Sequence, residues 1–144
     1  MTPLPGSRAA LVALAVAAAL HLGFQLAVTV LVYPALARVA PGDWSTSHDA
    51  HSRRIVPLVG LTYAALLGSG VWALAAAPLS VGLVVALVGA ATALLTTTFA
   101  AAPLHGRLGG GHDPALVTRL LRVDRVRAAG AAVCLVGAVG AVLT

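Results

Sequence analysis

The chain has 144 residues, of which 60% are hydrophobic and only 9% are charged. A soluble domain carries about 25% charged residues, so this composition excludes a water-soluble surface on a chain of this length. The formal net charge of +5 does not indicate nucleic-acid binding, because the arginines lie beside apolar runs and form no separate basic domain. We expect a single membrane domain whose first partner is the lipid bilayer.

The choice of basic residues indicates a source for the protein, and the single cysteine excludes a disulfide within the chain. All nine basic residues are arginine, and lysine, glutamate and asparagine are absent. An Ala/Gly/Val/Arg-rich composition is typical of a GC-rich genome, which predicts a bacterial protein of the inner (plasma) membrane. The one cysteine, Cys134, cannot form a disulfide within the chain and is expected to behave as a small buried hydrophobe.

Four apolar runs predict four membrane spans, at about residues 9–37, 56–76, 79–102 and 126–143. Each approaches or exceeds the roughly 20 residues that cross about 30 Å of hydrocarbon. Backbone groups in lipid must bond within their own segment, so each run is expected to be a helix. The first run continues well beyond the length of a signal-peptide core and is taken as a retained span. The predicted fold is all-α, an antiparallel four-helix transmembrane bundle.

The arginines predict the orientation of the bundle. They cluster in the two connections after the first and third spans, and Arg8 alone lies on the other side. The positive-inside rule therefore places both connections in the cytoplasm and both termini outside it. The eight clustered arginines are Arg38, Arg53, Arg54, Arg107, Arg119, Arg122, Arg125 and Arg127.

Helical extensions are expected in both cytoplasmic connections. Asp43 follows a Pro-Gly break and can cap a helix that runs from Trp44 into the second span, bending near Pro57. Asp113 precedes a proline, a pattern typical of an N-cap followed by the first turn of a helix. A helix over residues 114–143 would be about 45 Å long, so its first turns must project beyond the hydrocarbon.

Histidines on the predicted cytoplasmic side are the main candidates for chemistry. His48 and His51 share a helix face, and the ends of a bundle lie close enough for His105 and Asp124 to join them in one pocket. Imidazole and carboxylate ligands suit iron, copper, zinc or nickel, so His48, His51 and His105 form a candidate metal site. The same groups can serve as general bases. Solvated interfacial histidines are the alternative.

Polar residues inside the predicted spans form a second set. His21 and Gln25 are one turn apart in the first span, and Tyr63 and Thr96 of the next two spans can face them. A titratable group at membrane depth is expected to face the bundle interior, which makes these residues candidates for binding a substrate. A purely structural hydrogen-bonding role is the alternative.

Three aromatic residues are candidates for contact with the membrane interface, and acidic residues are absent from the predicted spans. Tyr33, Trp44 and Trp72 are expected to anchor the helices at the membrane interface, with Trp44 also a candidate for binding substrate. No carboxylate falls within the four predicted spans. That disfavours a small proton-coupled drug exporter, which uses an intramembrane acid as its relay.

Two segments carry a family resemblance. Thr97 is followed by Pro103-Leu104-His105, and Asp124 is followed by Arg127-Ala128, while Gly23-Phe24 precedes Pro34 in the first span. This pattern resembles the anthrone-oxygenase-like family of small four-helix membrane proteins. The likeness is best over residues 96–129 and looser in the first span.

The resemblance implies an oxygenase acting on a lipophilic aromatic or polyketide-like small molecule. In this reading His105 or His48 is the base, Arg127 or Arg54 stabilises the developing oxyanion, and Asp124 orients the imidazole. Such a reaction needs no bound cofactor, and a transition metal on the histidines is the alternative.

Two functions outside catalysis remain open. The chain could be a binding or assembly subunit whose histidines respond to pH or to a metal, or a small-solute carrier that acts as a homo-oligomer. An enzyme requires the histidines and Asp124 around one enclosed pocket. An assembly protein would carry them splayed into water, together with a seam of small residues facing lipid.

Overall fold

The computed structural model describes residues 6–144, and all the regular secondary structure within them is helical. Four helical stretches in this part of the chain are long and apolar enough to cross a membrane. The first stretch consists of α1 (Ser7–Ala27), the π-helical turn η1 (Val28–Val32) and α2 (Tyr33–Leu36), and the second of the 3-10 turn η2 (Pro41–Asp43) and α3 (Trp44–Ala76). The third consists of α4 (Val81–Thr96), the π-helical turn η3 (Thr97–Ala101) and α5 (Ala102–Leu108), and the fourth is α6 (Pro114–Leu143). The predicted all-α four-helix bundle is confirmed.

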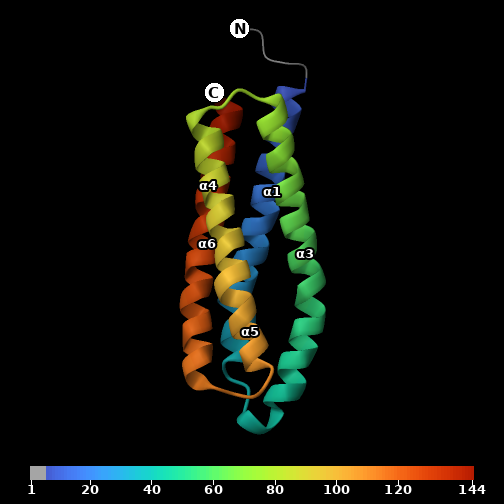
Figure 1. The fold of residues 1–144 in the computed structure, drawn as a ribbon, viewed down its shortest axis with the longest axis vertical. Helices are drawn as coiled ribbons and strands as arrows, with labels where there is room; N and C mark the ends of the chain where they lie inside the picture. The colour runs from blue at the N-terminus through green and yellow to red at the C-terminus, as the bar shows by residue number, and fades with distance from the viewer. Residues whose placement is uncertain (1–5) are drawn as a thin grey trace.

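Successive stretches run in opposite directions along the long axis of the bundle (Figure 1). The start of α1, the C-terminus and the short connection 77–80 lie at one end, which we call the terminal end. The connections 37–40 and 109–113 lie at the other, which we call the loop end. The third stretch continues past residue 102 to Leu108, so His105 lies within a helix of the bundle.

Side-chain caps begin two of the stretches. The Asp113 carboxylate accepts hydrogen bonds from the backbone N–H groups of Ala115 (2.8 Å) and Leu116 (3.2 Å), as its position before a proline predicts. Ser80 caps α4 in the same way, accepting from Leu83 N–H at 3.2 Å. Asp43 is the N-cap residue of α3, which begins at Trp44 as predicted, but the Asp43 side chain accepts no capping hydrogen bond.

The two π-helical turns stand at equivalent positions before prolines. Pro34 and Pro103 each lie two residues after the last residue of η1 and η3. Proline has no N–H, which removes the bond to the carbonyl four residues earlier. A widened turn re-satisfies freed backbone groups in an apolar surrounding, so both helices cross their proline without ending.

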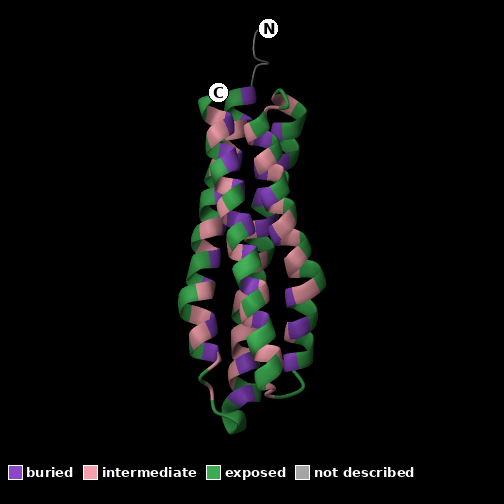
Figure 2. Ribbon diagram, turned by 90° about the vertical axis from the view of Figure 1, so that its left-hand side faces the viewer, coloured by how far each residue is buried: buried purple, intermediate pink, exposed green. Residues whose placement is uncertain are grey.

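The outside of the bundle is apolar on every stretch. Leu31, Leu61, Phe99 and Val136, one from each stretch, are all between 67% and 74% exposed. Figure 2 shows exposed residues over the outer surface, with buried ones facing the interior. A soluble monomer rarely exposes apolar surface of this extent, and acyl chains are the natural partner for it.

A glycine seam joins α4 to α6. A Cβ added to Gly89 would collide with the backbone of Cys134 and with the carbonyl oxygen of Gly130. Gly82 and Gly137 meet in the same manner about two helical turns further along the two helices. These glycines let the two backbones approach closely, as the small-residue spacing of α6 predicts.

α3 packs chiefly against α1, whereas α4 packs chiefly against α6. Contact between α3 and α4 is sparse in comparison. The second and third stretches therefore leave space between them towards the loop end, where the candidate site lies.

The seam yields a prediction about stability. Gly89→Ala forces backbone atoms of α4 and α6 apart and is expected to cost about 1–3 kcal/mol of unfolding free energy. Gly68→Ala is the matched control, since Gly68 is exposed and has open space at its Cβ position. The control should lose nothing, because alanine favours helix by up to about 1 kcal/mol. Thermal unfolding in detergent would test this, and equal melting temperatures for the two variants would contradict it.

Candidate functional site

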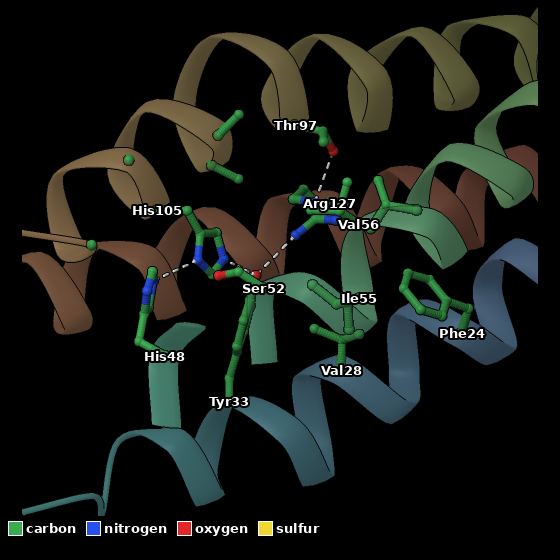
Figure 3. Close-up of a pocket in the computed structure, with 15 residues that line it drawn as sticks. Phe24, Val28, Tyr33, His48, Ser52, Ile55, Val56, Thr97, His105 and Arg127 are labelled. Carbon is green, nitrogen blue, oxygen red and sulfur yellow. Dashed lines mark hydrogen bonds between the residues drawn. The ribbon is translucent and has the colours of Figure 1, made fainter. Parts of the chain in front are cut away.

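A cavity of about 540 Å³ opens between α3 and the segment formed by η3 and α5. Apolar side chains make most of its lining, and polar groups gather on the wall nearest the loop end (Figure 3). Concave, mostly apolar cavities with a few convergent polar groups are the usual form of small-molecule sites. The lining consists of Phe24, Val28, Tyr33, His48, Ser52, Ile55, Val56, Val59, Thr97, Ala101, Ala102, His105, Gly106, Gly109 and Arg127.

A buried ion pair supports this wall. Asp124 and Arg127 lie one turn apart on α6, with 3.3 Å between Oδ1 and Nη1, and both side chains are almost fully buried. The carboxylate also accepts from Gln25 Nε2 and from Thr29 Oγ1, each at 2.6 Å. Its oxygens are thus satisfied from two helical stretches, a condition for keeping a charge pair inside a protein.

Arg127 connects the ion pair to the cavity. Its Nε donates to Thr97 Oγ1 at 2.9 Å, and Thr97 lies 2.6 Å from the Tyr63 hydroxyl. Its Nη1 donates to the Tyr33 hydroxyl at 3.4 Å. The guanidinium on α6 therefore bonds directly to the first and third helical stretches, and Thr97 links it to Tyr63 of the second.

A chain of hydrogen bonds leads from Arg127 to the histidines. The Tyr33 hydroxyl lies 2.9 Å from His105 Nε2, and His105 Nδ1 lies 3.4 Å from His48 Nε2. Arginine can only donate, so Tyr33 accepts from Arg127 and turns its own O–H towards His105 Nε2. His105 then carries its proton on Nδ1 and donates to His48, whose Nδ1 has no partner within residues 6–144.

Three of the six residues predicted to act as bases, metal ligands or charge stabilisers meet at the cavity, whereas His51, Asp124 and Arg54 do not line it. His48, His105 and Arg127 line it. Asp124 lies behind Arg127 and bonds to no imidazole, so its predicted role in orienting a histidine is wrong. Arg54 is exposed on another side of α3 and lines a separate groove, which removes it as an oxyanion stabiliser in this cavity.

The predicted substrate-binding residues do not line the cavity. His21 is buried beside Tyr63, with ring centroids 4.8 Å apart, and Gln25 is committed to Asp124. Thr97 lines the cavity, but its neighbour Thr96 points in a different direction from the helix axis and does not. Trp44 is buried and donates through Nε1 to the Leu108 carbonyl at 2.8 Å, so it is no interfacial anchor.

The three histidines proposed as metal ligands lie close together but do not form a ligand set. Ring centroids of His48 and His51 lie 5.6 Å and 5.8 Å from that of His105. His105 Nε2 already faces Tyr33. In the part of the chain that the structure describes, no group of three or more His, Cys, Asp or Glu side chains is arranged to hold a metal ion.

Tyr33 is the principal site residue that the sequence reading missed. It was predicted to anchor at the interface, but it is only 4% exposed and links Arg127 to His105. A signal existed, since Gln25, Thr29 and Tyr33 recur every four residues and so share one helix face. Asp124 corrects a second reading, because the helix of the fourth span does carry a buried carboxylate.

Comparisons of the chain with protein-family models, with curated proteins and with solved structures found no match. The likeness to the anthrone-oxygenase-like family stays a prediction from the sequence.

The ion pair gives a prediction about stability. Arg127→Met leaves a buried carboxylate uncompensated, which is expected to cost about 3–5 kcal/mol. Arg125→Met is the control, since Arg125 is exposed on the same helix. Adding Asp124→Asn to Arg127→Met should recover part of the loss, because the amide keeps hydrogen-bonding capacity without the charge. Unfolding in detergent measures these three variants together with Asp124→Asn alone, and a double variant whose loss equals the sum of the two single losses would contradict the pairing.

Proposed function

We propose that this protein is a membrane enzyme that removes a proton from a lipophilic, weakly acidic small molecule bound in the cavity. One observation carries the proposal: a mostly apolar cavity has His105, the Tyr33 hydroxyl and the Arg127 guanidinium linked by hydrogen bonds on one wall. A base, a proton carrier and a fixed positive charge are what such a reaction requires.

The opening of the cavity favours a substrate that arrives through lipid or along its interface. Its rim includes exposed residues of both walls, Val56 of α3 and Ala102 and Gly106 of α5. These groups are small or apolar, and they lie on the outside of helices suited to span a membrane. A lipophilic molecule can therefore enter sideways between the two helices.

The hydrogen-bond chain supplies a route for the proton. A proton leaving the substrate passes to the Tyr33 oxygen as Tyr33 gives its own proton to His105 Nε2, and His105 hands its Nδ1 proton to His48. Direct transfer to His105 Nε2 is the shorter variant. Arg127 lies beside the Tyr33 oxygen and lowers the energy of negative charge on it or on the substrate.

The family resemblance extends this proton transfer to an oxidation. The carbanion of an activated ring CH₂ group reduces dioxygen, and loss of water from the peroxide leaves a carbonyl. The balance is one CH₂ and one O₂ consumed for one C=O and one H₂O formed. Dioxygen is the only co-reactant, so the chain's residues supply binding, the base and charge stabilisation.

A seam of small residues facing lipid would have favoured an assembly subunit. The glycines of α4 and α6 instead face each other within one chain. The histidines also lie against a cavity and are not splayed into water. Both observations favour catalysis over the assembly reading.

Removal of the base tests the proposal. His105→Ala should lower dioxygen uptake with a hydroxylated anthrone by at least about 100-fold, the lower range for loss of a general base. His112→Ala is the control, since His112 lies outside the cavity lining. Unchanged uptake in the folded His105→Ala protein removes the base assignment. Loss of wild-type uptake on adding a chelator would instead assign the imidazoles to a metal.

Blocking the cavity tests where the substrate binds, independently of chemistry. Gly106 lines the cavity and has open space at its Cβ position, so Gly106→Phe should fill the entrance without a clash inside the helix. Affinity for the anthrone should fall by at least about tenfold. Gly68→Phe, equally exposed but far from the lining, should bind like the wild type. Equal binding by both variants would place the ligand elsewhere.

A further inference from the structure

A second hollow lies on another side of α3, between this helix and η1. Its volume is about 480 Å³, and we call it the outer groove. It shares Ile55 with the cavity and is otherwise separate from it. Its lining consists of Val32, Ser47, Ala50, His51, Arg54, Ile55 and Leu58.

The outer groove changes from polar to apolar along its length. Ser47, His51, Arg54 and Leu58 follow helical spacing along one face of α3, over about 16 Å. The polar members lie nearest the loop end, and the apolar run of the second span begins immediately after Arg54. Val32 of η1 faces the apolar end. The polar end thus reaches headgroup level, while the apolar end lies beside acyl chains.

The described part of the chain offers no partner for the charge at the polar end. Among residues 6–144 the ion pair of Asp124 with Arg127 is the single salt bridge, so Arg54 is not neutralised. His51 adds a buried Nε2 that has no hydrogen-bond partner among these residues. A positive group, a hydroxyl from Ser47 and an imidazole at one end of an apolar groove complement an anionic amphiphile.

We propose that the outer groove binds an anionic phospholipid. The phosphate lies against Arg54 and Ser47, and an acyl chain follows Val32, Ile55 and Leu58 towards the centre of the bilayer. This site goes beyond the proposed enzyme function and does not depend on it. Arg54 takes the role of a lipid anchor, in place of the catalytic role that its sequence position suggested.

His51 connects the lipid site to the cavity. Its ring stacks on that of His105, with centroids 5.8 Å apart and planes 26° from parallel. The same ring lies 6.2 Å from that of Tyr33. A lipid in the outer groove therefore packs behind the residues that hold the proton path in place.

The test compares two neighbouring arginines by native mass spectrometry of the purified protein. Phosphatidylglycerol and phosphatidylcholine with identical acyl chains are titrated against the wild type, Arg54→Gln and Arg53→Gln. Both variants lose one exposed charge, but Arg53 does not line the outer groove. Arg54→Gln should weaken phosphatidylglycerol binding by about tenfold, as expected for loss of a charge-assisted hydrogen bond. Arg53→Gln should keep wild-type affinity, and phosphatidylcholine should bind more weakly than phosphatidylglycerol to the wild type.

Inorganic phosphate separates a lipid from a free anion. If excess phosphate leaves phosphatidylglycerol bound, the acyl chain contributes and the lipid assignment stands. Complete displacement by phosphate would overturn it in favour of a simple anion site. Equal losses in the two arginine variants, or no loss in Arg54→Gln, would overturn the groove and leave a general surface-charge effect.

Discussion

The Asp124–Arg127 pair is the interaction on which the site depends, because burying two charges among apolar helices is costly unless every polar atom finds a partner. Gln25 and Thr29 meet the carboxylate, while Thr97 and Tyr33 meet the guanidinium. These partners lie on the first and third helical stretches, which are far from α6 in sequence. Satisfying one ion pair therefore fixes the rotation of several helices about their axes, and the cavity wall follows from those rotations.

Two prolines set the local geometry of that wall. Pro34 and Pro103 each produce a π-helical turn just upstream, and these turns supply Val28, Thr97 and Ala101 to the cavity. Tyr33 lies immediately after η1 and His105 about one turn after η3, and the Tyr33 hydroxyl meets His105 Nε2 at 2.9 Å. A widened turn shifts the phase of every following residue by a fraction of a turn. Functional groups that an unbroken α-helix would point elsewhere are thereby brought into contact.

Tight packing on one side of the bundle leaves room on the other. The glycine seam draws α4 against α6, and α3 packs chiefly on α1. Sparse contact between α3 and α4 leaves the cavity on one face of α3, and the outer groove lies on another. His51 and Ile55 form the partition between them. The proposed substrate site and the proposed lipid site therefore share one helix, α3, which has few other neighbours.

The sequence by itself determined the class of fold, because runs of about 20 apolar residues have no stable form in lipid other than a helix. It also determined which residues could do chemistry, since polar groups are rare enough in this chain to stand out. It could not assign them to one site, because membership depends on helix rotation. Thr97 lies in the cavity lining and Thr96 does not, although they are adjacent. Arg127 and Arg54 looked equivalent as charges, but the tertiary structure buried one against Asp124 and left the other exposed. Tyr33, which the sequence placed at the membrane interface, is buried in the structure. It lies directly after a π-helical turn, and its hydroxyl accepts a hydrogen bond from Arg127, which is far away in sequence.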